Sequence, residues 1–132
     1  LSRGDQSGTH DKEKSLWKAA GIAAKGPWYI ESGQGMGATL TIASEKGAYT
    51  LADRATHLAF KRRIQLMVLL EGDPALLNIY HVLEVSRARH PRVNAAGGKA
   101  FADFMLSAEA QQMIKTFGVE KYGEPLFFVG GG

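Results

Sequence analysis

Apolar residues recur at the three- or four-residue spacing of an amphipathic helix in several stretches of the chain. Ser, Thr, Asp or Asn, which commonly cap a helix at its start, precede these stretches. Glycines, which commonly end a helix, follow several of them. The pattern predicts helices over about residues 11–20 (capped by Thr9 or His10), 38–44, 53–60, 94–106 and 107–118.

Apolar runs of a different kind predict strands. Residues 66–70 are consecutive apolar residues, which is typical of a buried strand, and residues 79–85 form a second candidate. The shorter segments 28–30 and 48–51 fit either a strand or a loop or turn. Because short strands alternate with helices, we expect an α/β fold, in which ligands bind where strand ends meet helix N-termini.

Composition narrows the class of protein. The 132 residues suit one domain, and 45% of them are hydrophobic, which is enough for a core. The net charge of +3 is too balanced to predict a nucleic-acid partner, and no aromatic platform accompanies the basic cluster 61–63. The absence of cysteine excludes a disulfide scaffold and thiolate metal sites. No apolar run approaches the roughly 20 residues of a membrane span.

The segment 2–10, just ahead of the first predicted helix, has the groups that bind a small anion. Two glycines let the backbone approach a ligand closely. Ser7 and Thr9 can donate hydroxyl protons while also capping the helix, whose free N–H groups and dipole favour negative charge. Arg3 adds a planar set of donors that stays charged. The alternative is that the segment only caps the helix.

A second glycine-rich segment, Gly35-Met36-Gly37, precedes the helix predicted over 38–44. It resembles half of a dinucleotide-binding fingerprint, but it lacks the third glycine at the required spacing and no clear strand precedes it. Its bare amides at a helix N-terminus suit an anion as well as the first segment does. A flexible turn is the alternative here.

No catalytic constellation stands out. Ser7 lacks the glycine-x-serine-x-glycine pattern of a nucleophile elbow, because Asp5 stands where the first glycine should be. The four histidines show no metal-ligand spacing. Glu71 and Asp73 flank a turn glycine, a place where carboxylates usually cap or face solvent. The residues themselves therefore give no acid–base site, and the expectation of a binding protein rather than an enzyme comes only with the family resemblance that follows.

Long motifs in a fixed order resemble the tungstate-binding proteins of bacterial ABC transporters. The resemblance covers nearly the whole chain and implies a type II periplasmic binding protein, in which two α/β lobes close over one oxyanion and deliver it to a membrane permease. It is carried by the runs 2–10, 33–40 and 43–51 and, in the tail, by His90-Pro91, Phe117-Gly118 and 125–128.

The resemblance also implies how the chain is organised. Proteins of this family are longer, and the chain matches their later portion. Residues 1–85 would form most of the second lobe, and residues 86–132 would return to the first lobe. An N-terminal portion with another hydroxyl-rich loop would complete the site, so the expected partner is that portion or a second copy of the chain. Export to the periplasmic or extracellular face of the membrane, a permease partner and no cofactor are expected too.

The resemblance places particular donors at the anion. Tungstate and molybdate are full dianions without a proton to donate, so their site needs donors only. A phosphate site would also need a carboxylate acceptor, and we expect Asp5 to turn away from the ligand, toward Arg54 or a local backbone amide. The expected anion ligands are Arg3, Ser7, Gly8 and Thr9 and, by analogy with other oxyanion-binding proteins of this fold, the amides near Met36 and Gly37 and the turn Tyr49-Thr50.

Two other functions remain open at this point. One is a sensory or regulatory module of the same fold that binds an oxyanion or phosphate and signals to a partner. The other is an enzyme that acts on a phosphorylated substrate and depends on Ser7. The apolar residues of the segment 94–117 are expected to pack on a part of the fold outside this chain, and an exposed apolar patch there would favour association.

Overall fold

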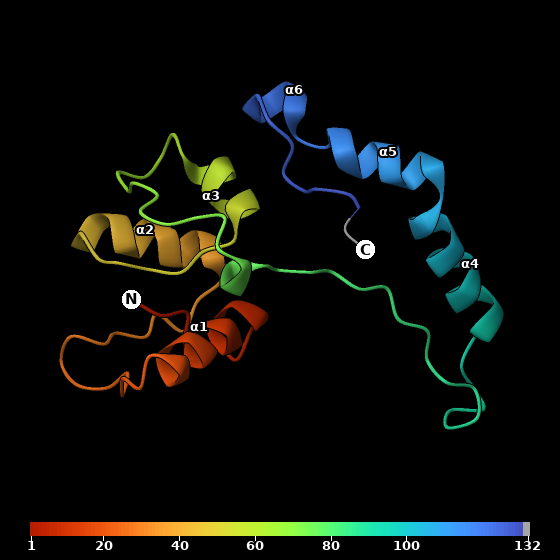
Figure 1. Cartoon of the computed structure of the whole chain (residues 1–132), viewed down its shortest axis with the longest axis horizontal. Helices are drawn as coiled ribbons and strands as arrows, with labels where there is room; N and C mark the ends of the chain where they lie inside the picture. Colours follow the sequence, from red (N-terminus) through yellow and green to blue (C-terminus); the bar gives the residue numbers. More distant parts are fainter. Residues whose placement is uncertain (131–132) are drawn as a thin grey trace. The chain divides into compact units, whose positions relative to one another are not determined.

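The computed structural model describes residues 1–130, which belong to two compact units, one of residues 1–78 and one that begins at Ile79. Both units are built mainly from helices (Figure 1). The first contains α1 (Gly8–Ala19), α2 (Met36–Lys46), α3 (Arg54–Phe60) and the 3₁₀ turn η1 (Pro74–Leu76). The second contains α4 (Ala95–Leu106), α5 (Ala108–Thr116) and α6 (Val119–Tyr122).

Helix α1 begins earlier than the sequence pattern predicts. Its first residue is Gly8, and its N-cap is Ser7 rather than Thr9 or His10. The Ser7 hydroxyl accepts a hydrogen bond from the His10 amide at 3.4 Å, which satisfies one of the N–H groups that lack an intrahelical partner. The helix ends just before Gly21, whose φ of 66° suits glycine.

Helices α2 and α3 confirm their predictions. Gly47 ends α2 in the left-handed conformation, with φ of 59°. The Asp53 carboxylate caps α3 by accepting a hydrogen bond from the Thr56 amide at 2.8 Å. Helix α2 begins at Met36 rather than at the predicted residue 38, and its N-cap Gly35 offers no side chain to the free amides.

A small core holds α2 against α3 and the segment that follows. Met36, Leu40 and Ile64 are buried together, and Phe60 packs against them. A Cβ atom placed on Gly37 would lie 2.4 Å from Cζ of the Phe60 ring. The two helices therefore approach this closely because residue 37 has no side chain.

A parallel bridge between Ser2 and Glu31 joins the two segments that lead into α1 and α2. The Ser2 amide donates to the Ile30 carbonyl at 2.7 Å, and the Ser32 amide donates to the Ser2 carbonyl at 2.9 Å. Because the paired segments run in the same direction, the loops that follow them leave from the same edge. Figure 1 shows α1 and α2 beginning on the same side of the first unit.

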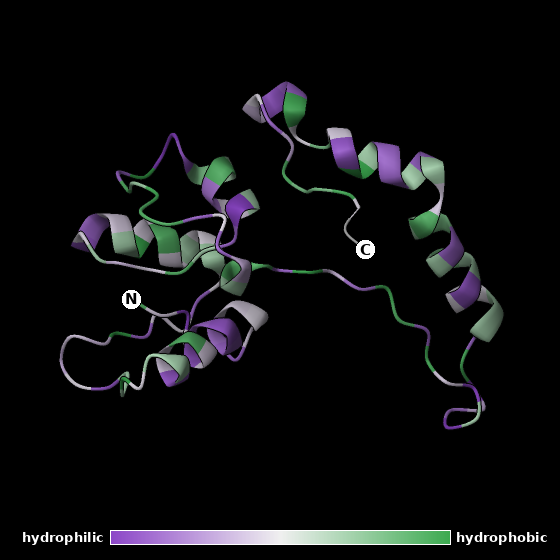
Figure 2. Cartoon of the chain, viewed as in Figure 1, coloured by the Kyte–Doolittle hydropathy of each residue, from purple (hydrophilic) through white to green (hydrophobic). Residues whose placement is uncertain are grey.

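The strands predicted over 66–70 and 79–85 are not formed, which corrects the expectation from the apolar runs. A strand is stable only when a neighbouring strand pairs with its N–H and C=O groups, and no such strand lies beside these segments among residues 1–130. These segments contain many hydrophobic residues (Figure 2). Most of their apolar side chains are exposed, for example Met67 at 82% and Leu83 at 83%. The segments 28–30 and 48–51 are loops.

The second unit also starts its helices as predicted. Asn94 caps α4 through the Gly97 amide at 2.9 Å, and Ser107 caps α5 through the Ala110 amide at 3.2 Å. Helix α6, which the pattern did not indicate, lies between two left-handed glycines, Gly118 and Gly123. The rings of Phe117 and Phe127 are 6.2 Å apart.

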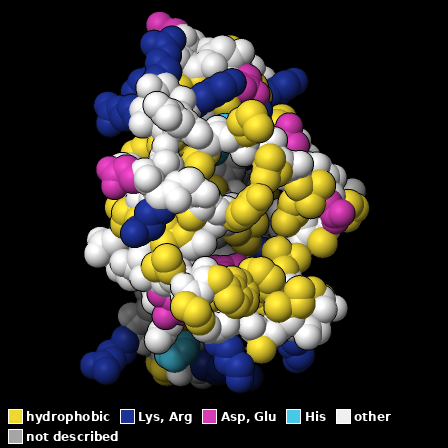
Figure 3. Space-filling view, turned by 90° about the vertical axis from the view of Figure 1, so that its left-hand side faces the viewer, with side chains coloured by type: hydrophobic (Ala, Val, Ile, Leu, Met, Phe, Trp, Pro, Cys, Tyr) yellow, Lys and Arg dark blue, Asp and Glu magenta, His cyan; other side chains and the backbone are white. Residues whose placement is uncertain are grey.

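Many apolar side chains of both units are open to solvent. Figure 3 shows apolar side chains gathered on one face of the molecule. In the second unit they include Phe101, Phe104, Met113 and Phe117, which belong to the segment expected to pack on another part of the fold. No helix within residues 1–130 is long and apolar enough to cross a membrane. The predicted boundary between the two lobes, after residue 85, concerns the longer fold and stays a prediction. Residues 131–132, which end the predicted segment 86–132, lie outside the described residues.

Replacing Gly37 by alanine should destabilise the first unit. The added methyl group overlaps the Phe60 ring, and overpacking of this kind typically costs about 1–3 kcal/mol in the free energy of unfolding. Gly8 is the matched control, because it also lies in the first turn of a helix and a Cβ atom there meets no atom within 4 Å. Gly8→Ala should change stability by less than about 1 kcal/mol. Urea unfolding of both variants measures the difference, and equal effects would contradict this packing.

The exposed apolar side chains should make the isolated chain associate, since contiguous apolar patches usually mark surfaces that bind another surface. Light scattering coupled to size-exclusion chromatography, at micromolar concentration, measures the mass in solution. We expect dimers or larger species, or segment-swapped forms. A monodisperse monomer over the whole concentration range would show that these side chains need no partner.

Candidate functional site

Three loops that the sequence singled out meet at the first residues of the chain. The Gly33 amide donates to the Arg3 carbonyl at 2.8 Å, and the Ser32 hydroxyl donates to the same carbonyl at 3.3 Å. The backbone nitrogen of Leu1 donates to the Tyr49 carbonyl at 2.6 Å. The first loop (residues 3–7), the second loop (residues 32–35) and the turn at Tyr49-Thr50 are thus all attached to residues 1–3.

Arg3 and Asp5 form an ion pair inside the first loop, between Nη2 of the guanidinium and Oδ2 of the carboxylate. The other carboxylate oxygen accepts a hydrogen bond from the Ser7 amide at 3.2 Å. The Ser7 hydroxyl, the Ser7 amide and Arg3 together lower the pKa of Asp5 from 3.8 to about 2. The expected contact of Asp5 with a local backbone amide is confirmed, and the carboxylate is ionised at neutral pH.

Two buried donors beside these loops have no partner. Nε of Arg3 and the hydroxyl of Thr50 are buried, and neither makes a hydrogen bond to any of residues 1–130. Buried polar groups are nearly always hydrogen-bonded, because an unmade bond costs the desolvation of the group. Two such donors on segments joined through Leu1 and Tyr49 point to an acceptor that residues 1–130 do not supply.

The first amides of α1 and α2 add further donors. The N–H groups of Gly8 and Thr9 have no hydrogen-bond acceptor within residues 1–130, and the same holds for Met36 and Gly37. Helix N-termini carry a partial positive charge and favour anions. The parallel bridge brings both of these termini to the edge where Arg3 lies.

The remaining predicted site residues are placed as follows. The Ser7 hydroxyl is used within the loop, as the cap of α1 and as a partner of Asp5. The Met36 side chain is buried in the core, so this residue offers only its amide to the site. Tyr49 is 80% exposed and contributes its carbonyl to the N-terminus of the chain. The assignment of these residues to an anion stays a prediction.

Ser32 belongs to the same edge, although sequence analysis did not select it. Its hydroxyl is 2.8 Å from the hydroxyl of Thr39, which is fully buried in α2, and it accepts from the Gln34 amide at 3.2 Å. Ser32 thereby fixes the second loop to α2 and to Arg3. A serine directly before a glycine-rich turn is the signal in the sequence that could have revealed it.

Glu13 is a buried carboxylate that sequence analysis also missed. It accepts hydrogen bonds from the Ser2 hydroxyl and, at 2.9 Å, from Nε1 of Trp17. Burial raises the pKa of Tyr29, and the neighbouring Glu13 carboxylate raises it further. Glu13 therefore ties α1 to the segment that carries Arg3. A glutamate inside a helix pattern looks like a surface residue, so the sequence alone gave no signal for this role.

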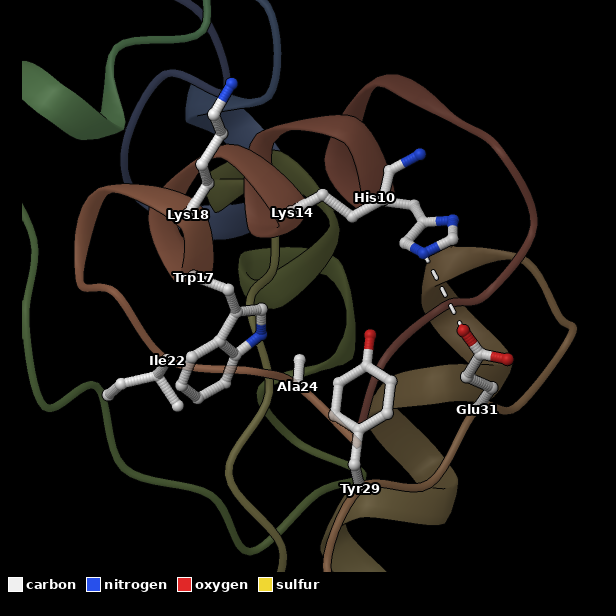
Figure 4. A pocket seen from close by; sticks show the side chains of 8 residues that line it. All are labelled: His10, Lys14, Trp17, Lys18, Ile22, Ala24, Tyr29 and Glu31. Atoms are coloured by element: carbon white, nitrogen blue, oxygen red, sulfur yellow. Dashed lines mark ion pairs between the residues drawn. The ribbon is translucent and has the colours of Figure 1, made fainter. Parts of the chain in front are cut away.

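An open pocket of about 420 Å³ lies behind the first loop (Figure 4). Its lining includes His10, Lys14 and Trp17 from α1 and Tyr29 and Glu31 from the segment before the second loop. Nε2 of His10 lies 3.8 Å from Oε1 of Glu31. Within residues 1–130 no three His, Asp or Glu side chains group together in a way that could hold a metal cation.

Comparison with known proteins identifies the family. Residues 1–109 match the family model described as a PBP superfamily domain. The chain is 46% identical over 127 residues to the tungstate-binding protein TupA of Peptoclostridium acidaminophilum, a match that covers 96% of the chain and 44% of that protein. It is 37% identical to the protein of the same name from Campylobacter jejuni, which covers 98% of the chain and 49% of that protein.

A solved structure agrees with these relatives. The crystal structure described as the tungstate ABC transporter from Geobacter sulfurreducens is similar with a TM-score of 0.68 and 37% identity, over 88% of the chain and 49% of that structure. The chain thus spans about half the length of the proteins that it matches. The likeness confirms the expected α/β periplasmic-binding-protein fold and the resemblance to tungstate-binding proteins. The chain belongs to the PBP superfamily.

Proposed function

We propose that the chain carries part of a binding site for a fully deprotonated tetrahedral oxyanion, tungstate or molybdate. The observation that carries this proposal is the pair of buried donors, Arg3 Nε and the Thr50 hydroxyl, for which residues 1–130 supply no acceptor, together with two helix N-termini at the edge where Arg3 lies. A dianion would satisfy these donors together with the amides of the first helical turns. The names of the similar proteins support the same ligand class.

The charge arrangement favours a dianion without protons. Asp5 is the one carboxylate of the first loop, and its oxygens are already hydrogen-bonded to Arg3 and Ser7. Because this carboxylate is turned toward its own loop, where it already accepts from Arg3 and Ser7, it is not directed at a protonated phosphate. Donors remain available in Arg3, Thr50 and the helix amides. The arrangement therefore suits tungstate or molybdate better than hydrogen phosphate.

The activity of the whole protein is part of the proposal, since the chain spans about half the length of its relatives. We propose a solute-binding protein that works on the periplasmic or extracellular face and delivers the anion to an ABC transporter permease. The remaining part of the protein would supply further donors and cover the exposed apolar segments. In this function the chain binds its ligand as a whole ion and catalyses no reaction, and it needs no cofactor.

Tungstate should bind one-to-one to the full-length protein, and Arg3→Ala should weaken binding strongly. Loss of a charge-assisted donor set at a buried anion is expected to cost about 10²-fold or more in Kd. Arg62→Ala is the matched control, because it removes the same charge from an exposed position and should leave Kd nearly unchanged. Calorimetric titration of tungstate, molybdate, sulfate and phosphate measures both variants.

The titration can contradict the proposal in two ways. Binding of phosphate alone, or of none of the four anions, would mean that the family likeness marks only the fold. Equal Kd values for Arg3→Ala and the wild type would remove Arg3 from the site even if tungstate binds. Turnover of a phosphorylated substrate that Ser7→Ala abolishes would favour an enzyme instead.

Asp5 should titrate with a pKa of about 2, as NMR of its carboxyl carbon would measure. Because the folded pKa lies below the ordinary value of 3.8, the stability that this carboxylate contributes is present above pH 3.8 and is lost as pH falls toward 2. Asp5→Asn should remove this part of the acid dependence of unfolding. An Asp5 midpoint close to 3.8 would show that the contacts with Ser7 and Arg3 do not persist in solution.

A further inference from the structure

The first loop contains a conformation that needs support. Gln6 has a backbone φ of 60°, and it is the one non-glycine residue with positive φ within residues 1–130. An L-residue rarely adopts this conformation, because its Cβ atom crowds the backbone. The Gln6 side chain is exposed, so its own burial does not compensate. Some other contact must hold the loop in this shape.

His10 provides that contact from the first turn of α1. The Gln6 amide donates a hydrogen bond to Nδ1 of His10 at 3.1 Å. An imidazole nitrogen accepts a hydrogen bond only when it carries no proton, so the remaining proton of the neutral ring lies on Nε2. That nitrogen faces Oε1 of Glu31 at 3.8 Å (Figure 4), which favours this tautomer. The ring itself is buried, with 8% of His10 exposed.

The backbone of His10 supports the same loop. Its amide donates to the Ser7 hydroxyl, next to the residue whose amide the imidazole binds. Gln6 lies between Asp5, which holds the Arg3 guanidinium, and Ser7, which caps α1. A change of the Gln6 conformation would therefore move Arg3 relative to the free amides of Gly8 and Thr9.

We propose that His10 is a positioning residue for the anion site. It does not touch the ligand. Its neutral imidazole holds Gln6 in the left-handed conformation, and the loop then presents Arg3 and the first amides of α1 in one fixed arrangement. This inference rests on the proposed function, and it adds a residue that acts on the ligand only through the backbone of its own loop.

Three variants of the full-length protein test the inference. His10→Leu fills the space of the ring but removes the acceptor. His10→Asn keeps an acceptor, because the side-chain oxygen of asparagine takes the place of Nδ1. The double variant His10→Leu with Gln6→Gly removes the acceptor and also the need for it, since glycine adopts positive φ readily. Calorimetry gives the Kd for tungstate, and thermal unfolding gives the stability of each ligand-free variant.

His10→Leu should raise the Kd for tungstate by about tenfold or more, as expected from the cost of a left-handed L-residue. His10→Asn should stay within about threefold of the wild type. The added Gln6→Gly should recover most of the lost affinity, which a merely structural role of the His10 ring in packing would not allow. If His10→Leu does not fold, His10→Gln is used in its place. Glutamine places its amide group at the position of Nε2, so this variant also lacks an acceptor at the position of Nδ1.

Two results would overturn the inference. One is a His10→Leu variant that binds tungstate as the wild type does. The other is a folded double variant that binds as weakly as His10→Leu alone. Hydrogen exchange of the Gln6 amide, measured by NMR without ligand, tests the contact between His10 and the loop independently of whether the protein binds an anion. Should the wild type not bind tungstate, slower exchange in wild type and His10→Asn than in His10→Leu would still support the positioning of the loop, and equal rates would refute it.

Discussion

The parallel pairing of Ser2 with Glu31 is the contact on which the candidate site depends. It consists of a few backbone hydrogen bonds, yet it sets the direction of two segments at once. Each segment passes through a short loop into a helix, so both helices begin at the same edge. The positive ends of two helix dipoles and the Arg3 guanidinium are brought together there by this one register, and the turn at Tyr49-Thr50 is attached separately through Leu1.

Buried polar contacts keep that edge in place. Glu13 holds the Ser2 hydroxyl and the Trp17 ring nitrogen, so α1 cannot slide along the paired segment without leaving a buried carboxylate unsatisfied. His10 contacts the first loop by accepting a hydrogen bond from the Gln6 amide. Both residues are buried on α1, and in the proposed arrangement neither meets the ligand.

The same structure leaves surfaces uncovered and donors unpaired. The apolar runs after α3 lie extended and exposed, and Arg3 Nε and the Thr50 hydroxyl are buried without an acceptor among residues 1–130. In the proposed function, a neighbouring strand of the longer protein would pair with the apolar runs, and the bound anion would accept from the two donors. Both features agree with a chain that spans about half the length of the PBP-superfamily proteins that it matches.

The sequence by itself determined the local elements. Asp53, Asn94 and Ser107 cap the helices that their positions predict, because a cap depends only on the few residues that follow it. The motifs at 2–10, 33–40 and 43–51 also identified the family, and the glycines and Arg3 of the first loop led to the prediction of an anion ligand. Only the tertiary structure decided the rest. Whether an apolar run such as 66–70 becomes a strand depends on a distant partner, and the roles of Glu13, Ser32 and His10 depend on which backbone lies beside them in space. Local pattern contains no information on such contacts.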